Sequence, residues 1–497
     1  MTLLSAATAP SLASRVERPS YDRSAVRRGI VHLGIGAFHR AHQAMIFDSI
    51  LNSGDHRWGI TGASLRSPAV RDQMRPQDWL YTVVTRGEGQ EHYRLVGSIS
   101  EILVATEEPK MLVDRIASPE TKLVTLTITE KGYKFDRAGG GLQVADEDVR
   151  IDLRTLAAPR TAIGFLTAAL ALRHANGSEP LTILSCDNLP DNGGLLRSAV
   201  SEMAEAHDST LSHWIATECS FLNSMVDRIV PATRAEDLVA ISQRIGIEDR
   251  AAVKTESFCQ WVIEDRFVCG KPDLQSAGVH LTDDVRPWEV AKLRLLNGAH
   301  SAIAYLGGLM GIEHVDEFVS MPSGEQYINE LWSESRTTFV APSGLDVEGY
   351  CRSLIQRFRN SSLAHRTSQI AMDGSQKLPQ RLCAPIETRL KQSRSADALA
   401  LAVAAWIRWQ GGVTDDGRKF VVDDPLAQKI ERTLRGLTNP RDQVHAALSL
   451  REIFSEPLAN HVMFRELLVQ HLESLTAFGV RATLRRVAAT ANADAGT

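Results

Sequence analysis

Clustered cysteines and long apolar runs are both missing from this 497-residue chain. The six cysteines are scattered and form no Cys-x-x-Cys pair, which argues against a zinc site and a disulfide framework and favours reduced thiols in a cytoplasm. The longest apolar run, residues 302–310, is too short to cross a bilayer and contains two glycines. These absences predict a cytoplasmic protein that has no metal site and no membrane partner.

An excess of positive charge is missing as well. The net charge of −5 supplies no global attraction for nucleic acid or anionic membranes, so we expect no nucleic-acid partner. A hydrophobic content of 43% and a charged content of 23% are ordinary for a soluble globular enzyme. The length exceeds what one hydrophobic core usually supports, so two domains are expected, in a monomer or a small homo-oligomer.

The first half of the chain alternates between strand-like and helical patterns. Strand-like runs at 29–33, 58–65, 122–129 and 181–186 alternate with helical patterns at 41–51, 109–116 and 161–174, and 81–84 with 93–96 suggest a hairpin. This alternation predicts an α/β fold with a mostly parallel, doubly wound sheet.

Beyond about residue 284 the helical periodicity dominates, most clearly at 347–359, 396–409, 425–434 and 461–475. A stretch rich in Asp, Gly and Pro, residues 271–287, marks the change. The predicted organisation is an N-terminal extension over 1–20, a Rossmann-like dinucleotide-binding domain over 21–283, and a mainly α-helical substrate-binding domain over 284–490.

The first strand-like run ends in a glycine pair, Gly34 and Gly36, that opens a helical pattern. Such a turn brings backbone amides close to a pyrophosphate, so the segment from Gly34 through Ile35, Gly36, Ala37 and Phe38 is a candidate cofactor-binding loop. The third glycine of the usual fingerprint is replaced by His39, and a plain strand–helix turn is the alternative. Arg40 could serve the diphosphate or lie on the surface.

The acidic residue expected after the second strand is also missing. Residues 63–67 read Ala-Ser-Leu-Arg-Ser, whereas an acid at this point would bind the ribose hydroxyls of NAD. Arg66 and the serines could instead accept a 2′-phosphate. The cofactor is expected to be NAD, and NADP stays open.

Polar residues follow two further predicted strands, at the edge where doubly wound sheets bind ligands. Thr129 and Glu130 follow one strand, and Asp187 and Asn188 follow another. An asparagine can donate to a developing alkoxide without adding charge, although Asn188 could equally serve as a turn or cap residue. Asp227 is either a structural partner of the neighbouring arginine or a site acid.

Lys292, Asn297 and His300 lie in an apolar helical segment. With Lys292 at 0° and about 100° of rotation per residue, His300 falls at about 80° and Asn297 at about 140°. Glu289, at about 60°, shares this arc, and Arg294, at about 200°, points away. Burial of an unpaired ammonium lowers its pKa towards neutrality, so Lys292 is a candidate general base. The alternative is a structural Lys–Glu pair.

These motifs together resemble the long-chain polyol dehydrogenase, or mannitol dehydrogenase, family, most closely its fructuronate reductases. The matching blocks are 30–44, 129–133, 186–188, 225–229 and 292–300. The resemblance covers about residues 20–480. It implies hydride transfer without zinc, with Lys292 as acid/base, Asn188 and Asn297 polarising the carbonyl, and His300 orienting the substrate.

Within the family, residues 366–381 resemble the fructuronate reductases, because mannitol enzymes tend to carry arginine where Gln369 stands. A uronate brings a carboxylate that a guanidinium can clamp, so Arg381 or Arg366, with Lys377, could select an acid. The expected reaction interconverts D-fructuronate and D-mannonate. The alternatives are a mannitol 2-dehydrogenase or another polyol 2-dehydrogenase acting on D-arabinitol, and a nicotinamide-binding sensor without turnover.

Overall fold

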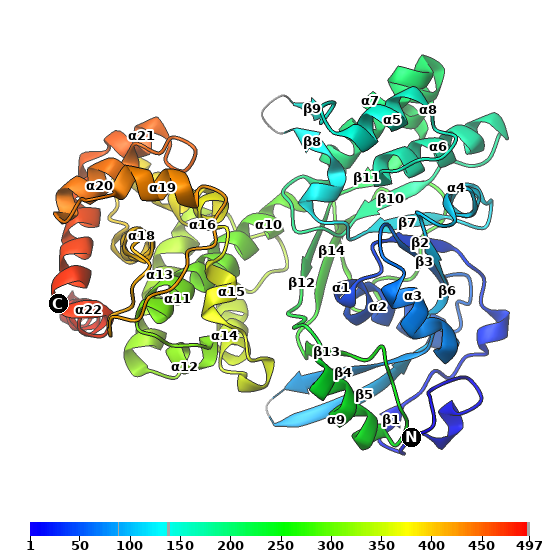
Figure 1. Ribbon diagram of the computed structural model, residues 1–497, viewed down its shortest axis with the longest axis horizontal. Helices are drawn as coiled ribbons and strands as arrows, with labels where there is room; N and C mark the ends of the chain where they lie inside the picture. Colours follow the sequence, from blue (N-terminus) through cyan, green and yellow to red (C-terminus); the bar gives the residue numbers. More distant parts are fainter. Residues whose placement is uncertain (88, 137–139, 495–497) are drawn as a thin grey trace. The chain divides into compact units, whose positions relative to one another are not determined.

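Two compact units make up the chain in the computed structural model, which describes residues 1–87, 89–136 and 140–494. Unit 1 is Met1–Arg286 and unit 2 is Pro287–Thr497. Unit 1 contains all the strands, whereas the described part of unit 2 is helical (Figure 1). Each unit is described separately below.

A six-stranded parallel sheet forms the centre of unit 1 (Figure 1). Its strands in spatial order are β11 (Ser220–Leu222), β10 (Thr182–Ser185), β7 (Leu123–Leu126), β2 (Ile30–Leu33), β3 (Ile60–Ser64) and β6 (Ile99–Val104). From β2 the chain builds outward to β3 and β6, and then returns to build β7, β10 and β11 on the other side. The order therefore reverses between β2 and β7, which is where doubly wound sheets bind ligands, outside the carboxyl ends of the strands.

The central strands are buried along their whole length because both faces of the sheet are covered. Along β2, Val31 and Leu33 pack into one core with Phe165, while Ile30 packs into another core with Phe47. Side chains alternate between the faces of a strand, so a strand buried on both sides is mostly apolar, and here the polar exceptions His32 and Thr125 contact each other.

The helices of unit 1 mostly lie around this sheet, and the last of them packs instead against a smaller sheet described below (Figure 1). They are α1 (Ala37–Ala41), α2 (Gln43–Asn52), α3 (Ala69–Met74), α4 (Pro109–Ala117), α5 (Glu147–Arg154), α6 (Ala162–Ala175), α7 (Asn192–His207), α8 (Ser209–Glu218) and α9 (Ala235–Ile245). The helix predicted over 41–51 is α2, and the backbone of His42 (φ −127°, ψ −89°) separates it from the short helix α1, which the sequence did not predict.

Smaller sheets flank the parallel one. The first comprises β1 (Val16–Glu17), β5 (Gln90–Val96), β4 (Tyr81–Gly87) and β13 (Val253–Glu256); the second β12 (Ser224–Asp227), β14 (Gln260–Glu264) and β15 (His280–Thr282); and the third β8 (Phe135–Asp136) and β9 (Gly141–Leu142). Strands β4 and β5 are the predicted antiparallel hairpin, although residue 88 of its turn lies outside the described residues. Residues 1–20 belong to unit 1: β1 pairs with β5, and Leu4, Leu12 and Val16 are buried.

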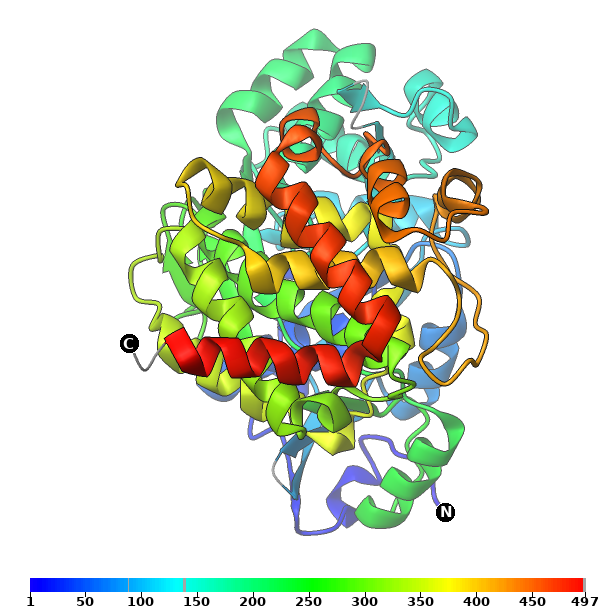
Figure 2. The ribbon, with the colours of Figure 1, turned by 90° about the vertical axis from the view of Figure 1, so that its left-hand side faces the viewer.

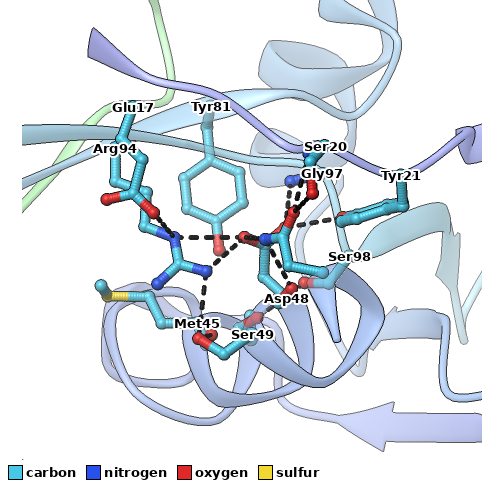
Figure 3. Close-up of polar contacts among 12 residues, drawn as sticks. Glu17, Ser20, Tyr21, Met45, Asp48, Ser49, Tyr81, Arg94, Gly97 and Ser98 are labelled. Atoms are coloured by element: carbon cyan, nitrogen blue, oxygen red, sulfur yellow. Dashed lines mark hydrogen bonds and ion pairs between the residues drawn. The ribbon is translucent and has the colours of Figure 1, made fainter. Parts of the chain in front are cut away.

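The carboxylate of Asp48 joins α2 to the first flanking sheet and to the N-terminal segment (Figure 3). Asp48 is completely buried. Its oxygens accept hydrogen bonds from the Tyr21 hydroxyl at 2.6 Å, from Arg94 Nη2 at 2.8 Å and from the Gly97 amide at 2.9 Å. A buried charge is tolerated only when it is paired and hydrogen-bonded. Asp48 meets this condition and thereby fixes α2, the second helix after the glycine turn.

Unit 2 is built from helices packed around α18. They are α10 (Arg286–Lys292, which begins at the unit boundary), α11 (Gly298–Leu309), α12 (Val315–Val319), α13 (Pro322–Ser335), α14 (Val347–Phe358), α15 (Thr367–Ala371), α16 (Gly374–Leu378), α17 (Ala384–Lys391), α18 (Asp397–Trp409), α19 (Ala427–Leu434), α20 (Pro440–Leu448), α21 (Glu456–Asn460) and α22 (Val462–Asp494). Nearly every side chain of α18 is buried, and its alanines let α11, α13 and α22 approach.

The last helix, α22, bends sharply at Gly479, as the two red arms in Figure 2 show. Gly479 has φ 73° and ψ 173°, a conformation that glycine adopts without strain. The fold class predicted from the sequence, α/β with a Rossmann-like first domain and a mainly helical second domain, is confirmed. None of the helices within the described ranges combines the length and the apolar composition needed to cross a bilayer.

We predict that Asp48→Ala lowers the free energy of unfolding by about 3–5 kcal/mol, because the substitution strands the buried partners of the carboxylate. Chemical denaturation of the full chain measures the change. Asp72→Ala is the matched control: Asp72 is exposed and pairs with Arg71 at the surface, so its loss costs less than about 1 kcal/mol. Equal effects of the two substitutions would contradict the role given to Asp48.

Candidate active site

The glycine turn after β2 has the geometry that a dinucleotide diphosphate needs. Gly34 has φ 101°, and a Cβ atom there would lie 2.0 Å from the Thr127 carbonyl oxygen, so only glycine fits. At Gly36, by contrast, an added Cβ would meet nothing closer than 4.0 Å. The backbone at Gly36 and Ala37 therefore borders open space at the start of α1, as close approach of a phosphate requires.

His39, which stands where the fingerprint has its third glycine, is part of a buried imidazole pair. Its ring stacks on His32 at a centroid distance of 3.4 Å. His32 contacts the hydroxyl groups of Thr125 (2.7 Å) and Thr127 (2.9 Å). Burial lowers the pKa of His32 to about 3 and that of His39 well below its ordinary value. Both rings are therefore neutral and pack as flat, polarisable groups beneath the turn.

Arg40 is directed into unit 1. Its Nη1 donates to the Ala251 carbonyl at 2.5 Å, its guanidinium lies 5.6 Å from the centre of the Tyr81 ring, and the Tyr81 hydroxyl donates to the Arg40 carbonyl at 2.7 Å. These contacts engage Nη1 and the face of the Tyr81 ring, and the buried Nε has no hydrogen-bond partner among the described residues. The same contacts join α1 to the first flanking sheet.

Asp187 connects the loops that follow β7 and β10. Its carboxylate accepts hydrogen bonds from the amides of Ile128 (3.0 Å) and Thr129 (2.8 Å) and from the Tyr133 hydroxyl (2.9 Å). Thr129 has φ 63°, an uncommon conformation for a non-glycine residue, and the bond from its amide helps to hold it. Thr129 and Glu130 themselves are exposed at this edge of the sheet.

Asn188 is exposed on the loop between β10 and α7, and a buried asparagine holds the end of that loop. Asn192 Nδ2 donates to the carbonyls of Asp187 and Ser224, each at 2.8 Å, and its Oδ1 accepts from the Ser224 amide at 3.1 Å. Because Ser224 begins β12 and Asp227 ends it, Asn192 links the segments that carry Asn188 and Asp227.

The carboxylate of Asp227 is buried, but its neighbour Arg228 has other partners. Arg228 donates to the carbonyls of Ala41 (2.5 Å, Nη1) and Glu256 (2.9 Å, Nη2). Arg66, at the end of β3, is exposed and lines a cavity in unit 1.

In unit 2 the helix that carries Lys292 changes its winding. After α10, residues Leu293–Asn297 form a π-helical turn, and α11 continues from Gly298. The straight α-helix assumed from the sequence is therefore wrong over this stretch. A π-turn closes i→i+5 hydrogen bonds, so Asn297 is rotated back towards Lys292. Arg294 points elsewhere, to the Thr338 carbonyl.

Lys292, Asn297 and His300 are each only 7% exposed, as the sequence predicted for a buried segment. Neither Asn297 Nδ2 nor His300 Nε2 has a hydrogen-bond partner within the ranges of the chain that the structure describes. Buried polar atoms are nearly always hydrogen-bonded in folded proteins. Two such atoms near one another on the same helix are therefore available to a ligand.

A second π-helical turn, Pro379–Cys383, packs against the first. The close approach depends on Gly298, where an added Cβ would lie 3.2 Å from the Arg381 carbonyl oxygen. Arg381, within this turn, donates from Nη1 to the Ser301 hydroxyl at 3.2 Å. π-turns are rare and occur mostly at functional sites. Here they bring Arg381 to the helix that follows Lys292.

The imidazole of His300 is neutral and lies among cationic side chains. Burial is the main cause that lowers its pKa well below the ordinary value. The further causes are the neighbouring groups His365, Arg357, Arg381 and Lys292. His365 meets the His300 ring edge-on at 5.1 Å. Residues from α10, α14 and the second π-turn therefore gather around one imidazole.

Arg357 and His365 were not predicted from the sequence. Arg357 is buried on α14 in line with Tyr350 and Leu354, which follow the i, i+4, i+7 spacing of a core-facing stripe. A charged residue at a core position of such a stripe was the signal that could have identified it. His365, in the segment between α14 and α15, carries no comparable signal.

Lys377 and Arg381 are cations without carboxylate partners within 4 Å among the described residues. The Lys377 ammonium donates to the carbonyls of Met372 and, at 3.3 Å, Ile370. Burial, with the nearby Arg381, lowers the pKa of Lys377 to about 8, and burial lowers the pKa of Arg381 to about 10. The hydrogen-bond partners of both groups are neutral, and for Lys377 the more distant carboxylates of Asp373 and Asp424 offset only part of the cost of burial.

Arg366 does not share this environment. It is exposed, and it pairs with Glu313 at 3.3 Å. Among the residues that the structure describes, no group of three or more His, Cys, Asp or Glu side chains is arranged to hold a metal ion.

Comparison with known proteins identifies both units. The sequence model of the mannitol dehydrogenase Rossmann domain matches residues 28–276, and that of the mannitol dehydrogenase C-terminal domain matches residues 284–476. The uncharacterized oxidoreductase YeiQ of Escherichia coli K12 is 42% identical over 478 residues, covering 95% of this chain and 97% of the relative. The D-mannonate oxidoreductase of the same organism is 42% identical over 457 residues, covering 90% and 93%.

A solved structure agrees with these matches. The Pseudomonas fluorescens mannitol 2-dehydrogenase, in a ternary complex with NAD and D-mannitol, superposes with a TM-score of 0.86 at 35% identity, covering 98% of this chain and 99% of that one. With both units matched in this way, the chain belongs to the mannitol dehydrogenase family of oxidoreductases.

Proposed function

We propose that this polyol or sugar-acid dehydrogenase interconverts D-fructuronate and D-mannonate with NAD, using Lys292 as its acid/base. The observation that carries this proposal is the pair of half-buried cations Lys377 and Arg381 in the helical unit, which have no carboxylate within 4 Å among the described residues. Uncompensated buried charge is costly unless a ligand of opposite charge binds there. The carboxylate at the far end of D-mannonate supplies that charge, whereas a neutral polyol does not.

The glycine turn supports NAD as the cofactor. The backbone from Gly34 to Phe38 would hold the diphosphate, since Gly36 borders open space at the start of α1. Thr129 and Glu130 lie at the same edge of the sheet as this turn. NAD, when bound, supplies the hydride acceptor. The similarity to a mannitol 2-dehydrogenase solved with NAD supports the same choice.

In the oxidation direction, Lys292 Nζ takes the proton of the substrate hydroxyl while hydride leaves the same carbon. A buried amine suits this role, because burial favours its uncharged form. The amides of Asn188 and Asn297 donate to the oxygen as it gains negative charge. The neutral His300 orients the hydroxyl through Nε2, which has no partner among the described residues. Asp227 binds a further substrate hydroxyl.

The substrate carboxylate is held by Arg381 and Lys377. A guanidinium and a carboxylate form short, bidentate hydrogen bonds, and an ammonium adds a point charge. Arg357 adds positive potential at the same place. Arg366 contributes less, because it is exposed and paired with Glu313. The 42% identity to a D-mannonate oxidoreductase supports this choice of substrate.

A neutral polyol such as D-mannitol is the second candidate. It is favoured by the similarity, over 98% of the chain, to a mannitol 2-dehydrogenase solved with D-mannitol. The same chemistry at Lys292 would serve either substrate. The two candidates differ in what they require of Arg381 and Lys377.

We predict that Lys292→Ala lowers kcat by about 10²–10⁴-fold, the range expected for loss of a general acid/base. Binding of NADH, followed by its fluorescence, stays unchanged, and added primary amines restore part of the rate. Lys391→Ala, at the exposed end of α17, is the matched control. Undiminished activity of the Lys292→Ala variant would rule out Lys292 as the acid/base. Cofactor binding without turnover of any sugar acid or polyol in the wild type would favour a sensor.

We predict that kcat/KM for D-mannonate exceeds that for D-mannitol, and that Arg381→Ala lowers only the former. The expected loss is about 1.5–3 kcal/mol, the range for a hydrogen bond to a charged group. Steady-state kinetics with both substrates measure it, and a melting curve checks that the variant is folded. A preference for D-mannitol that Arg381→Ala leaves unaltered would favour the polyol reading.

We predict that affinity for D-mannonate falls as the pH rises through about 8, because the pKa of Lys377 is lowered to about 8. The sign follows from the charge: the ammonium is present below this pH and is lost above it. A bound carboxylate raises the pKa of Lys377, so in the complex saturated with D-mannonate the ammonium is lost at a higher pH than in the free protein. Binding titrations with D-mannonate across pH 6–10 measure the change in affinity. We expect Lys377→Arg to abolish the decrease in affinity above pH 8. D-Mannitol binding should not follow the same curve.

A further inference from the structure

A cavity of about 410 Å³ opens at the carboxyl ends of β3 and β6 in unit 1. Part of its wall is apolar and comes from Leu65, Ala105, Pro109 and Phe165. Arg66, Lys134 and Arg160 supply the cations of the wall, and Asp148 is its one acid. The size and the mixture of flat apolar surface with charged groups suit an adenosine bearing an anionic substituent.

The charges around this cavity are not equally available. Arg160 lies 3.7 Å from Asp148, and Lys134 pairs with Asp146 at 2.5 Å. Arg66 makes no ion pair within the parts of the chain that the structure describes, and it is exposed. It is therefore the cation of this wall that can turn to a ligand without breaking an existing pair.

The end of β3 is also the point where a nicotinamide dinucleotide is discriminated. An aspartate or glutamate there binds the 2′- and 3′-hydroxyls of NAD and repels a 2′-phosphate, whereas an arginine nearby accommodates the phosphate. In this chain β3 ends at Ser64, and Leu65 and Arg66 follow. The Ser64 hydroxyl donates to the Ser67 carbonyl at 2.5 Å and so shapes the turn that carries Arg66.

Asp148 does not replace the missing acid. It comes from α5 rather than from a strand end, and Arg160 already lies beside it. No carboxylate in this turn therefore opposes a second phosphate.

We propose that this cavity binds the adenosine end of the dinucleotide with Arg66 on a 2′-phosphate, so that the chain uses NADP(H) as well as NAD(H). The guanidinium can form two parallel hydrogen bonds to a phosphate dianion, which a ribose hydroxyl cannot match. The inference rests on the proposed nicotinamide-dependent function. It does not depend on which sugar substrate is used.

The test measures binding of two nucleotide fragments to the full chain by calorimetry, without any turnover. Adenosine 2′,5′-bisphosphate should bind about tenfold or more tightly than adenosine 5′-monophosphate, because the guanidinium meets the added phosphate. Arg66→Ala should remove that difference and leave the monophosphate affinity unchanged. Arg71→Ala is the matched control, since that guanidinium, on α3, is already paired with Asp72 and Glu107.

Steady-state rates with NADP and NAD provide a second readout, in which Arg66→Ala should lower kcat/KM for NADP alone. Equal affinities of the two fragments in the wild type would overturn the proposal. The proposal would also be overturned if Arg66→Ala weakened the binding of both fragments equally, or if the wild type bound neither fragment. A chain that prefers the bisphosphate but turns over neither D-mannonate nor D-mannitol would uphold it while refuting the proposed function.

Discussion

The constraint on which the helical unit depends is the cost of withdrawing Arg381 and Lys377 from water, where their hydrogen-bond partners are neutral. Burial lowers the pKa of Lys377 to about 8 and that of Arg381 to about 10, which measures how unfavourable their charge is in place. The groups that contact them, the Ser301 hydroxyl and the Met372 carbonyl, do not neutralise them. The apolar packing around α18 supplies the stability that offsets this cost. The unit thus keeps two cations in place whose hydrogen-bond partners are neutral.

Burial and nearby positive charge also explain why His300 is neutral. A protonated His300 would be repelled by the neighbouring side chains Lys292, Arg357 and Arg381. Its pKa is therefore lowered, and the ring stays uncharged. A neutral ring can both donate and accept hydrogen bonds, which suits a hydroxyl that loses its proton during oxidation. His32 and His39 in unit 1 follow the same rule, since burial keeps both rings uncharged beneath the glycine turn.

The features that could be predicted from the sequence are those that depend on a few neighbouring residues, such as buried strands, tight turns and buried helical segments. Strands such as β2 and β7 could be found because burial on both faces requires mostly apolar runs. Gly34 could be found because it follows such a run directly, and its φ and its contact with Thr127 explain why glycine stands there. The burial of Lys292, Asn297 and His300 followed from the apolar residues around them. These features depend on a few neighbouring residues and leave a local pattern.

Features that depend on distant contacts could not be predicted in this way. A helical wheel assumes regular α-helical winding, so it cannot reveal a π-turn. The need for glycine at position 298 becomes clear only in the structure, where the Arg381 carbonyl packs against it. Arg40 and Asp187 were expected to bind the cofactor, and in the structure their hydrogen bonds to the Ala251 carbonyl and the Ile128 amide join separate elements of unit 1. Such partners lie far away along the chain, so their pairing is decided by tertiary structure.

The two adjoining π-turns also affect how this family can tolerate length changes. Each π-turn holds one residue more per hydrogen-bonded loop than an α-helix does. Deleting a single residue from 293–297 would let α10 and α11 join as one regular helix, which is the more favourable winding. The residue that closes a π-turn at i+5 would then close an α-turn at i+4, so the side chains beyond the deletion would keep nearly the same facing relative to Lys292. A chain shortened by one residue between Lys292 and Asn297 would therefore gain helical regularity and still hold its amine, amide and imidazole on one side of the helix.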